Sequence, residues 1–570
     1  MKDSSSRPIN VDSTCLSHTG KLLDANLIGK WVAVVIWTPF LGFEGSRRDG
    51  LSYDYSGYTL CKNEPEDPLY NGGIIINHNQ SQPDKVSSTL VLPNLSGNTI
   101  YSFSSWVKIS GSNGTAIKAS LTLDNDTHMC IGNVVAKSEC WSFLKGGFVL
   151  DSPSDHAVVY FLDSYGKRIN VTLTSASLQP FTHQQWQNNQ DNSIDKERKR
   201  AVTIHVSDVD GKIIQGARII VEQTSRNFPF GSAISKAILG NLPYQKWFLE
   251  RFNAAVFENE LKWCATEPEQ GRVNYTIPDL MLDFVRANQI TVRGHNIFWE
   301  DPMYIPSWVQ NLTGGALDSA VKSRIQGLMT HYKNQFVHWD VSNEMLHYDF
   351  YEQRLGQNAS MEMFELAHTT DPLAMLFMND FNVVETCDDL NSSATAYAAR
   401  MKEVEEGGVT MDGVGLEGHF ITPNPPLIRG VLDQLAALQL PIWLTEVDIS
   451  NTLDPETQGK YLEIVLREVY SHPSVDGIML WTAMDPMGCY QMCLTDANFQ
   501  NLPAGDVVDR LIFKEWSTAV VNGESDEDGT LSFDGFLGEY VVNVDFGNKT
   551  SNSTFFISKG DETIHFSIQL

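Results

Sequence analysis

Two glutamates lie near the ends of apolar segments that are far apart in the chain. Glu344 closes the segment WDVSNE, and Glu446 lies in the segment WLTEVD. Hydrolysis of a glycosidic bond needs two carboxyl groups: one protonates the leaving oxygen, and the other attacks the anomeric carbon or activates water. A single glutamate at a strand end is more often a solvated surface residue than a catalyst. Two such glutamates, each with its own polar neighbourhood, favour this chemistry.

The residues around the two glutamates have the properties that this chemistry requires. Asn343 precedes Glu344 and is suited to donate to a sugar hydroxyl, and His419 is suited to hydrogen-bond Glu446 and keep it ionised. Asp448 follows Glu446 by two residues, so on a strand both side chains point to the same face. Its negative charge would help to separate the two carboxyl pKa values. Polar side chains interleaved with tryptophan, as a polysaccharide groove requires, end two earlier apolar runs: Glu258, Asn259, Lys262, His295 and Trp299.

The elements that would position these residues lie between residues 226 and 516. Eight βα units in roughly 290 residues match the size of a (β/α)8 barrel, which keeps its active site at the carboxyl ends of the strands. Glu344 and Glu446 end the fourth and seventh strands, which lie on opposite sides of the barrel mouth, so the two carboxylates would face each other across a substrate. The eight apolar runs are FPFGSAI, FNAAVFENE, ITVRGHNIFW, QFVHWDVSNE, AMLFMNDFN, GVGLEGHF, PIWLTEVD and GIMLWTAMD.

The segments on either side of this region read as β-structure. Residues 50–183 contain short strands with alternating polarity and predict an all-β sandwich. The polar stretch 184–200 reads as a linker. Residues 201–225 form a predicted hairpin that we expect to pair with residues 517–570, which gives one discontinuous β-domain with the barrel inserted between its halves. Two separate β-appendages are the alternative.

Composition restricts the class of protein and its partners. A chain of 570 residues with 42% hydrophobic and 19% charged residues is expected to fold as about three globular domains. The formal net charge of −29 argues against nucleic acid or an anionic membrane as a partner. Nothing in the sequence demands more than a monomer.

Sequons and cysteines indicate a secreted, extracellular or cell-wall protein. Eight cysteines, including the close pair Cys489 and Cys493, permit disulfides in that compartment. Each sequon alone is weak evidence, but their density fits a glycoprotein of the secretory pathway. They lie at Asn79, Asn94, Asn113, Asn125, Asn170, Asn274, Asn311, Asn358, Asn391, Asn548 and Asn552.

The N-terminal extension, residues 1–49, contains one apolar run. WVAVVIWTPFLGF, residues 31–43, follows Lys30 and is too short to span a bilayer comfortably. We interpret the segment 31–45 as a signal-peptide core, although about thirty residues precede it, which is unusual. A start site further along the chain, a short anchor and a buried strand are the alternatives.

Residues 226–516 resemble glycoside hydrolase family 10. The resemblance implies a retaining mechanism on β-1,4-xylan through a covalent glycosyl-enzyme, with Glu344 as acid/base and Glu446 as nucleophile. The matching motifs follow the family's order along the barrel: FENELKW (257–263), RGHNIFW (293–299), WDVSNE (339–344), FMNDFN (377–382), GVGLEGHF (413–420), LTEVDI (444–449) and LWTAMD (480–485).

The same resemblance implies roles for the groove residues. Glu258, Asn259 and Lys262 would bind the sugar two places to the non-reducing side of the cut, and His419 would orient the nucleophile. The residues that would surround the sugar at the cleavage point are His295, Trp299, Asn343 and Trp481.

Four positions depart from the family's usual pattern, in a way similar to its plant branch. Glu417 stands where many relatives have glutamine, and Glu300 follows Trp299 where histidine is common. Phe381 replaces a usual tyrosine, and Tyr490 is the aromatic residue where a second tryptophan is usual. These changes leave the catalytic pair intact and bear on subsite affinity, pH optimum and the balance of hydrolysis against transglycosylation.

The predicted β-sandwich resembles a family 22 carbohydrate-binding module of jelly-roll architecture. The matching pieces are NGGIIIN (71–77), YSFSSWVKI (101–109), VVAKSECWSFLKGGFVLD (134–151) and VTLTSASLQPF (171–181). Within it, a Cys130–Cys140 disulfide is one expected pairing. The resemblance implies that this domain binds xylan.

Two other functions remain as alternatives to an endo-xylanase. One is a transglycosylase of xylan, or a hydrolase of another β-1,4-glycan. The other is a non-catalytic wall protein that only binds xylan, although inert relatives usually lose one catalytic glutamate and both are present here. No cofactor is expected, because the sequence has no dinucleotide fingerprint, P-loop, HExxH motif or cysteine and histidine cluster with zinc spacing.

Overall fold

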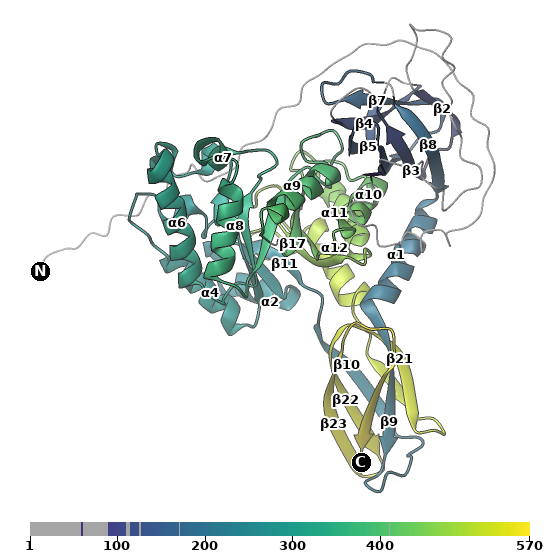
Figure 1. Ribbon diagram of the computed structural model, residues 1–570. Coiled ribbons are helices and arrows are strands. Elements are labelled where there is room, and N and C mark those ends of the chain that lie inside the picture. Colours follow the sequence, from purple (N-terminus) through teal and green to yellow (C-terminus); the bar gives the residue numbers. More distant parts are fainter. Residues whose placement is uncertain (1–58, 61–88, 110–113, 125–126, 170, 410) are drawn as a thin grey trace, which may run out of the picture.

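The computed structural model describes residues 59–60 and 89–570, apart from 110–113, 125–126, 170 and 410. Figure 1 shows three bodies: a β-sandwich, a central barrel and a slender β-domain that ends at the C-terminus. The N-terminal extension with its apolar run, and the NGGIIIN segment, lie outside the described residues. Among the helices that are described, none has the length and apolarity needed to cross a membrane.

The central body is a closed barrel of eight parallel strands, which confirms the fold predicted from the eight apolar runs. A pairing between β13 and β15 closes the ring, and the short strand β14 (Phe298–Trp299) lies beside β15. The eight strands are β11 (Phe230–Ile234), β12 (Ala254–Phe257), β13 (Thr291–Gly294), β15 (His338–Asn343), β16 (Met375–Asp380), β17 (Gly413–Phe420), β18 (Ile442–Ile449) and β19 (Val475–Leu480).

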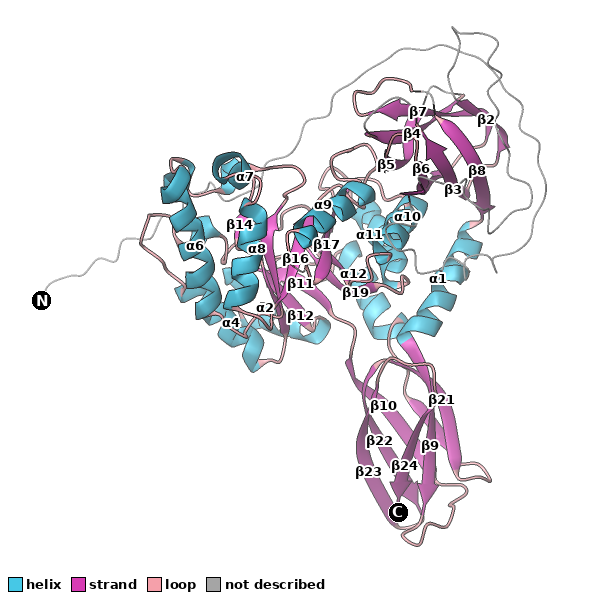
Figure 2. Ribbon diagram, viewed as in Figure 1, coloured by secondary structure: helices cyan, strands magenta, loops and turns pink. Residues whose placement is uncertain are grey.

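Helices connect successive strands and surround the barrel (Figure 2). Their apolar residues recur at helical spacing, as in α4, which buries Pro278, Met281, Leu282 and Val285. The connecting helices are α2 (Leu242–Arg251), α3 (Trp263–Thr266), α4 (Thr276–Ala287), α5 (Ser307–Gln310), α6 (Gly314–His331), α7 (Phe350–Leu355), α8 (Ala359–Thr370), α9 (Ala394–Glu406), α10 (Pro425–Ala436), α11 (Pro455–Tyr470) and α12 (Pro503–Arg510), with the short turns η4 (Lys236–Ile238), η5 (Pro302–Tyr304) and η6 (Leu511–Glu515).

Side chains of several strands fill the barrel interior. Phe377, Trp443 and Met479 belong to one buried cluster that ends at Trp481 near the mouth. Gly477 makes room for the Trp443 ring, because a Cβ at this position would lie 2.4 Å from a ring atom. The interior is therefore a packed core that supports the mouth from below.

The stretch 184–200, predicted to be a linker, is a helix and not an irregular segment. α1 (His183–Arg198) begins with a capping box between Thr182 and Gln185. Its buried face is largely polar: Gln190 donates to Glu468, and Arg198 donates to backbone carbonyls near the end of α11. Because this face binds through hydrogen bonds, apolar periodicity did not reveal the helix.

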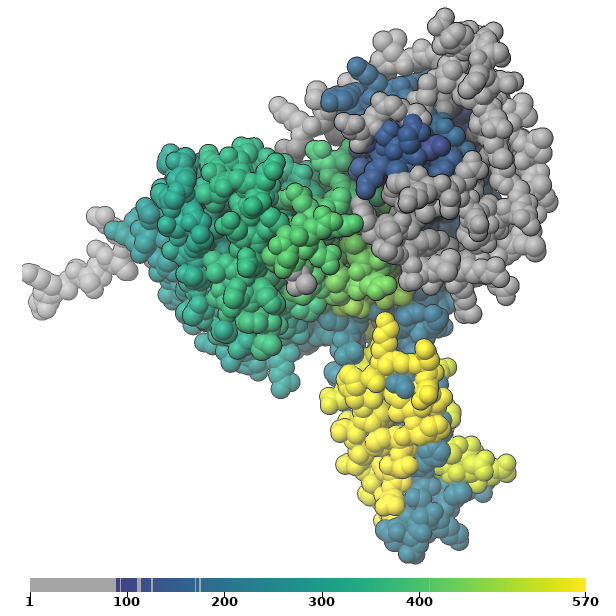
Figure 3. All heavy atoms as spheres, viewed as in Figure 1, coloured from purple at the N-terminus to yellow at the C-terminus, as the bar shows by residue number. Residues whose placement is uncertain are grey.

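The two segments that flank the barrel form one β-domain of two sheets. β9 (Lys199–Ser207) pairs with β21 (Thr530–Phe536) and β24 (Ile564–Gln569), while β10 (Arg218–Arg226) lies between β20 (Val521–Glu524) and β22 (Gly538–Phe546), and β23 (Lys549–Ile557) pairs with β22. Ile204, Ile219 and Tyr540 share its core. These are the pairings that the single-domain hypothesis requires, and Figure 3 shows this domain projecting away from the barrel.

The N-terminal body packs two four-stranded sheets face to face. In β3, Tyr101, Phe103 and Val107 are buried while Ser102 and Ser104 between them are partly exposed, the alternation expected of a sandwich strand. The sheets have the orders β1-β6-β3-β8 and β2-β7-β4-β5. Their strands are β1 (Thr59–Leu60), β2 (Thr89–Leu95), β3 (Thr99–Lys108), β4 (Thr115–Leu123), β5 (His128–Ala136), β6 (Trp141–Leu150), β7 (Ser154–Asp163) and β8 (Thr172–Phe181).

A disulfide joins this sandwich to the barrel. Cys130 of β5 is bonded to Cys387 in the loop after β16, so the expected Cys130–Cys140 pairing is wrong. The two residues are 257 positions apart, and only the docking of the sandwich brings them together. Ion pairs between Lys118 and Asp388 and between Lys145 and Asp433 cross the same interface. A second disulfide, Cys489–Cys493, joins the pair that the sequence singled out.

Replacing Cys130 and Cys387 by serine is expected to uncouple the sandwich from the barrel. Loss of a long-range cross-link lowers the free energy of unfolding by about 2–4 kcal/mol, and calorimetry should show the sandwich melting in a separate, earlier transition. The matched control replaces Cys489 and Cys493, which close only a short loop and leave the interface intact. Equal melting curves for the two double variants would contradict the cross-linking role.

Candidate active site

The two candidate carboxyl groups lie at the carboxyl-terminal mouth of the barrel. Glu344 directly follows β15 with a left-handed backbone (φ 63°), a region that residues other than glycine seldom occupy. Its N–H donates to the carbonyl of Asn379 at 2.9 Å, which fixes this turn. Glu446 lies within β18. The two residues are only 7% and 5% exposed, so both carboxyl groups are largely withdrawn from water.

Asn379, at the end of β16, connects residues from three other strands. Its Nδ2 lies 2.9 Å from Asn343 Oδ1, 3.1 Å from Glu417 Oε1 and 2.9 Å from Glu446 Oε1. Asn379 lies in the motif FMNDFN, but no role was predicted for it. Its position in the sequence could have revealed it as a site residue, because it follows the apolar part of the fifth run. The other groove residues follow the apolar parts of their own runs in the same way.

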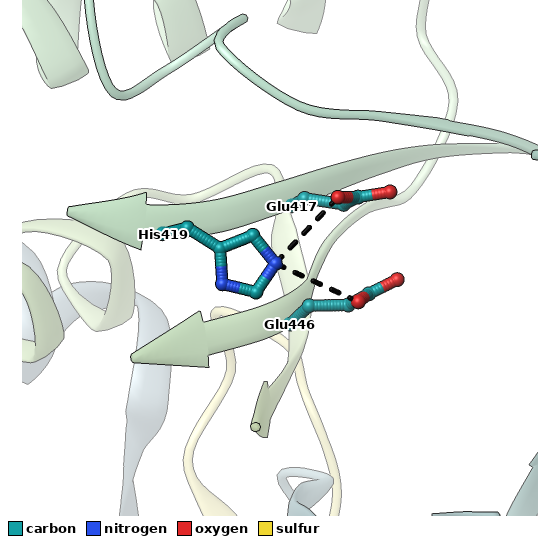
Figure 4. Close-up of side chains that lie close together, drawn as sticks. All are labelled: Glu417, His419 and Glu446. Carbon is teal, nitrogen blue, oxygen red and sulfur yellow. Dashed lines mark ion pairs between the residues drawn. The ribbon is translucent and has the colours of Figure 1, made fainter. Parts of the chain in front are cut away.

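His419 lies between three carboxyl groups, of which Figure 4 shows those of Glu417 and Glu446. Its Nδ1 is 2.9 Å from Asp448 Oδ1, and its Nε2 lies 3.6 Å from Glu417 Oε2 and 3.7 Å from Glu446 Oε2. Burial alone would lower the pKa of His419, but the charges and contacts of Asp448, Glu417 and Glu446 outweigh burial and raise this pKa well above its ordinary value. The His419 side chain in turn lowers the pKa of Glu446 and so stabilises its negative charge.

A second histidine approaches Glu446 from the other side. His295 Nδ1 lies 3.0 Å from Asp340 Oδ2 and 3.8 Å from Glu446 Oε1. Arg293 donates to the other oxygen of Asp340 at 2.6 Å, so the acceptor of the histidine is itself held in place. The His295 ring meets Trp481 edge to face at 5.2 Å between centroids. Asp340 was not among the sequence candidates, because it precedes the polar end of its strand.

Lys262 connects the outer groove residues to the two carboxyl groups. Its Nζ donates to Asn259 Oδ1 at 2.9 Å and lies 4.5 Å from the centroid of the Trp299 ring. Trp299 stacks on Tyr304 with centroids 3.8 Å apart, which fixes its plane. Glu258 is buried, and burial together with the nearby charge of Asp485 raises its pKa to about 8.

The environments of Glu344 and Glu446 shift their pKa values in opposite directions. Burial, with the charges of Asp380 and Glu446, raises the pKa of Glu344 to about 8, although the Trp299 side chain opposes this shift. Burial would also raise the pKa of Glu446, but His295, His419 and Lys262 together lower it below its ordinary value of 4.5. At neutral pH one carboxyl group is therefore a proton donor and the other is an anion, the division of roles that a glycosidase needs.

The residues that depart from the family pattern have defined environments. Glu417 is 2% exposed, and burial with the charges of Glu446 and Glu344 raises its pKa well above the ordinary value, which favours its protonated form. Glu300 accepts hydrogen bonds from Ser342 and the Tyr351 amide, so its carboxyl group is held in place within the barrel wall.

Two aromatic departures pack against histidines. Phe381 stacks on His347, with ring centroids 3.7 Å apart, and His347 lies between Asp380 and Asp389. The Tyr490 ring meets His419 edge to face at 5.5 Å.

The nine groove candidates lie on strands and loops at the same barrel mouth as the two carboxyl groups. Lys262 contacts Asn259 and Trp299, Asn379 links the strands, and the two histidines flank Glu446. The nine are Glu258, Asn259, Lys262, His295, Trp299, Asn343, Glu417, His419 and Trp481.

A closed (β/α)8 barrel with a protonated and an ionised carboxyl group at its mouth, flanked by tryptophans and sugar-compatible polar groups, defines a barrel glycosidase. Residues 220–509 match the sequence model of Glycosyl hydrolase family 10, and the chain belongs to this family.

Several proteins are similar to this chain. Endo-1,4-beta-xylanase 5 of Arabidopsis thaliana is 37% identical over 470 residues, which cover 80% of this chain and 81% of that protein. Endo-1,4-beta-xylanase 4 of the same plant is 34% identical, with 82% and 83% covered. The crystal structure of native xylanase 10B from Thermotoga maritima is 25% identical and covers 51% of this chain and 96% of its own, with a TM-score of 0.46. The family match and the Arabidopsis relatives confirm the resemblance of the barrel to family 10.

Proposed function

We propose that this protein is an endo-1,4-β-xylanase that cleaves internal linkages of xylan with retention of configuration, using Glu344 as acid/base and Glu446 as nucleophile. The opposite pKa shifts of these two carboxyl groups within one buried network carry the proposal. Xylan is the substrate because relatives named as endo-1,4-beta-xylanases match four-fifths of the chain.

The reaction proceeds in two displacements. Glu446 attacks the anomeric carbon while Glu344 gives its proton to the leaving oxygen, which forms a covalent glycosyl-enzyme. Glu344, now ionised, then takes a proton from water as the water attacks the anomeric carbon, and Glu446 leaves. Carboxyl chemistry alone suffices for both steps.

Groove residues position the sugars during these steps. His295, Trp299, Asn343 and Trp481 surround the sugar at the cleavage point. Glu258, Asn259 and Lys262 bind the sugar two places toward the non-reducing end. His419 and Asn379 hold the nucleophile, since both contact its carboxylate.

The proposed setting is extracellular, with a secreted monomeric glycoprotein acting in the cell wall. The disulfides Cys130–Cys387 and Cys489–Cys493 support this compartment, since such bonds persist in oxidising surroundings. The N-terminal β-sandwich acts as a xylan-binding module of family 22. Its cross-link to the barrel would keep a bound chain near the groove.

Product analysis tests the activity. The full chain, expressed through a secretory host, is incubated with glucuronoarabinoxylan, and mixed-linkage glucan and mannan are tested in parallel. We expect short xylo-oligosaccharides from the wild type and none from Glu446→Ala. Faster cleavage of glucan or mannan, or xylan left intact by the wild type, would refute the assignment. A labelled xylo-oligosaccharide acceptor separates hydrolysis from transglycosylation, because only transfer incorporates the label into longer chains.

A further inference from the structure

Three potential metal ligands converge at one side of the barrel mouth. Glu417 and His419 are two residues apart on β17, so their side chains lie on the same face of the strand. Glu446 is the register partner of Glu417 on the neighbouring strand β18. Figure 4 shows the three side chains pointing toward one another. The arrangement follows from strand pairing and is not visible as a local motif in the sequence.

The spacing of the ligand atoms suits a small tetrahedral ion. One ligand atom from each residue lies within 4.8 Å of the others, and His419 Nε2 is 3.6 Å and 3.7 Å from the Oε2 atoms of Glu417 and Glu446. Zinc bonds of about 2.0–2.2 Å in tetrahedral geometry place ligand atoms about 3.3–3.5 Å apart. The two distances from His419 to the glutamates are therefore within a few tenths of an ångström of those in a zinc site.

Neighbouring side chains orient each ligand atom toward the centre of the cluster. Asp448 engages His419 Nδ1 at 2.9 Å, which leaves Nε2 facing the two glutamates. Asn379 Nδ2 engages Oε1 of both glutamates, which leaves both Oε2 atoms facing the histidine. Carboxylate–histidine pairs and hydrogen-bonded ligating carboxylates are the outer contacts that zinc sites use.

We propose that Glu417, His419 and Glu446 form a binding site for zinc or a similar divalent transition metal, and that the bound metal blocks the enzyme. One imidazole and two carboxylates suit zinc better than calcium or magnesium, which prefer all-oxygen sites. Binding exchanges the metal for protons held by the ligands. Coordination occupies Glu446, so metal and substrate exclude each other. The blocking part of the proposal rests on the proposed function, whereas the binding part rests on geometry alone.

Cobalt provides a readout that does not depend on activity. The full-length protein is freed of metal with a chelator and titrated with Co²⁺, and the visible absorption of low-coordinate cobalt is followed. We expect one cobalt per chain at this site, displaced by zinc, and affinity at least tenfold lower in Glu417→Gln. The matched control is Glu300→Gln, another buried glutamate of the barrel that lies outside the cluster, and its affinity should equal that of the wild type.

Two further measurements complete the test. Asp448→Asn, which keeps all three ligands but changes the histidine's support, should weaken cobalt binding about 10–100-fold. Xylotriose should displace the bound cobalt and abolish its visible absorption, and zinc should raise KM for xylan without lowering kcat.

The proposed metal site is wrong if the wild type shows no low-coordinate cobalt, or if Glu417→Gln binds cobalt with the affinity of the wild type. If xylotriose does not relieve the inhibition by zinc, the proposal that bound metal blocks the active site is wrong. A metal-free protein that fails to cleave xylan refutes the proposed function, while the cobalt titration still decides the site.

Discussion

Glu446→Ala is expected to lower kcat/KM on xylan by about four to six orders of magnitude, because no other group at the mouth replaces the attacking carboxylate. Glu417 is a neighbouring carboxyl group, but its pKa is raised well above the ordinary value, and it contacts the same Asn379 amide from another strand. The residual rate is measured on xylan and on an aryl β-xylobioside with a good leaving group.

Azide identifies the step that this variant has lost. In Glu446→Ala the space left by the carboxylate admits azide, which attacks the anomeric carbon directly and gives an α-glycosyl azide from the activated substrate. Thermal unfolding and binding of xylotriose by the variant control for misfolding. A folded variant that retains more than about one per cent of wild-type activity would exclude Glu446 as the nucleophile.

Glu344→Ala is expected to reduce turnover of xylan by about 10²–10⁴-fold, the usual contribution of a general acid/base. The loss should be much smaller for the first displacement of substrates whose leaving group needs no proton. Azide should then attack the covalent intermediate and give a β-glycosyl azide. The opposite product configurations obtained from the two variants distinguish their roles, and equal losses on both kinds of leaving group would contradict the acid role of Glu344.

The pH profile reports the same two groups. Glu344 acts in its protonated form, so kcat/KM should fall as the pH rises through its pKa of about 8. Glu446 acts as an anion, and its pKa lies below 4.5, so the acid limb should lie below that value. In Glu344→Ala the alkaline limb should disappear on activated substrates. An alkaline limb that persists unchanged would assign it to another group.

The sandwich interface and the active site are structurally connected. Cys387, which carries the cross-link, lies in the same loop as Asp389, and Asp389 contacts His347. His347 in turn contacts Asp380, whose charge contributes to the raised pKa of Glu344. The loop after β16 thus forms part of both the domain interface and the surroundings of Glu344.

The sequence by itself determined the barrel and singled out Glu344 and Glu446. Each strand appears as a short apolar run because it is buried on both faces, and each run ends in polar residues because the strand ends open onto the mouth. Glu344 and Glu446 were recognisable for this reason, since a local pattern places them. The sequence also predicted that residues 201–225 pair with residues 517–570, but the hairpin expected within residues 201–225 is wrong, because β9 and β10 lie in different sheets.

Only the tertiary structure decided which side chains from different strands meet. Asn379 was unassigned because its contacts with Glu417 and Glu446 depend on the register of neighbouring strands, which no local pattern encodes. Cys130 meets Cys387 through domain docking, and α1 was missed because its buried face is polar. The protonation states of the carboxyl groups follow from the same cause: pKa values depend on burial and on charges that pack nearby in space, and both are fixed only when the barrel closes.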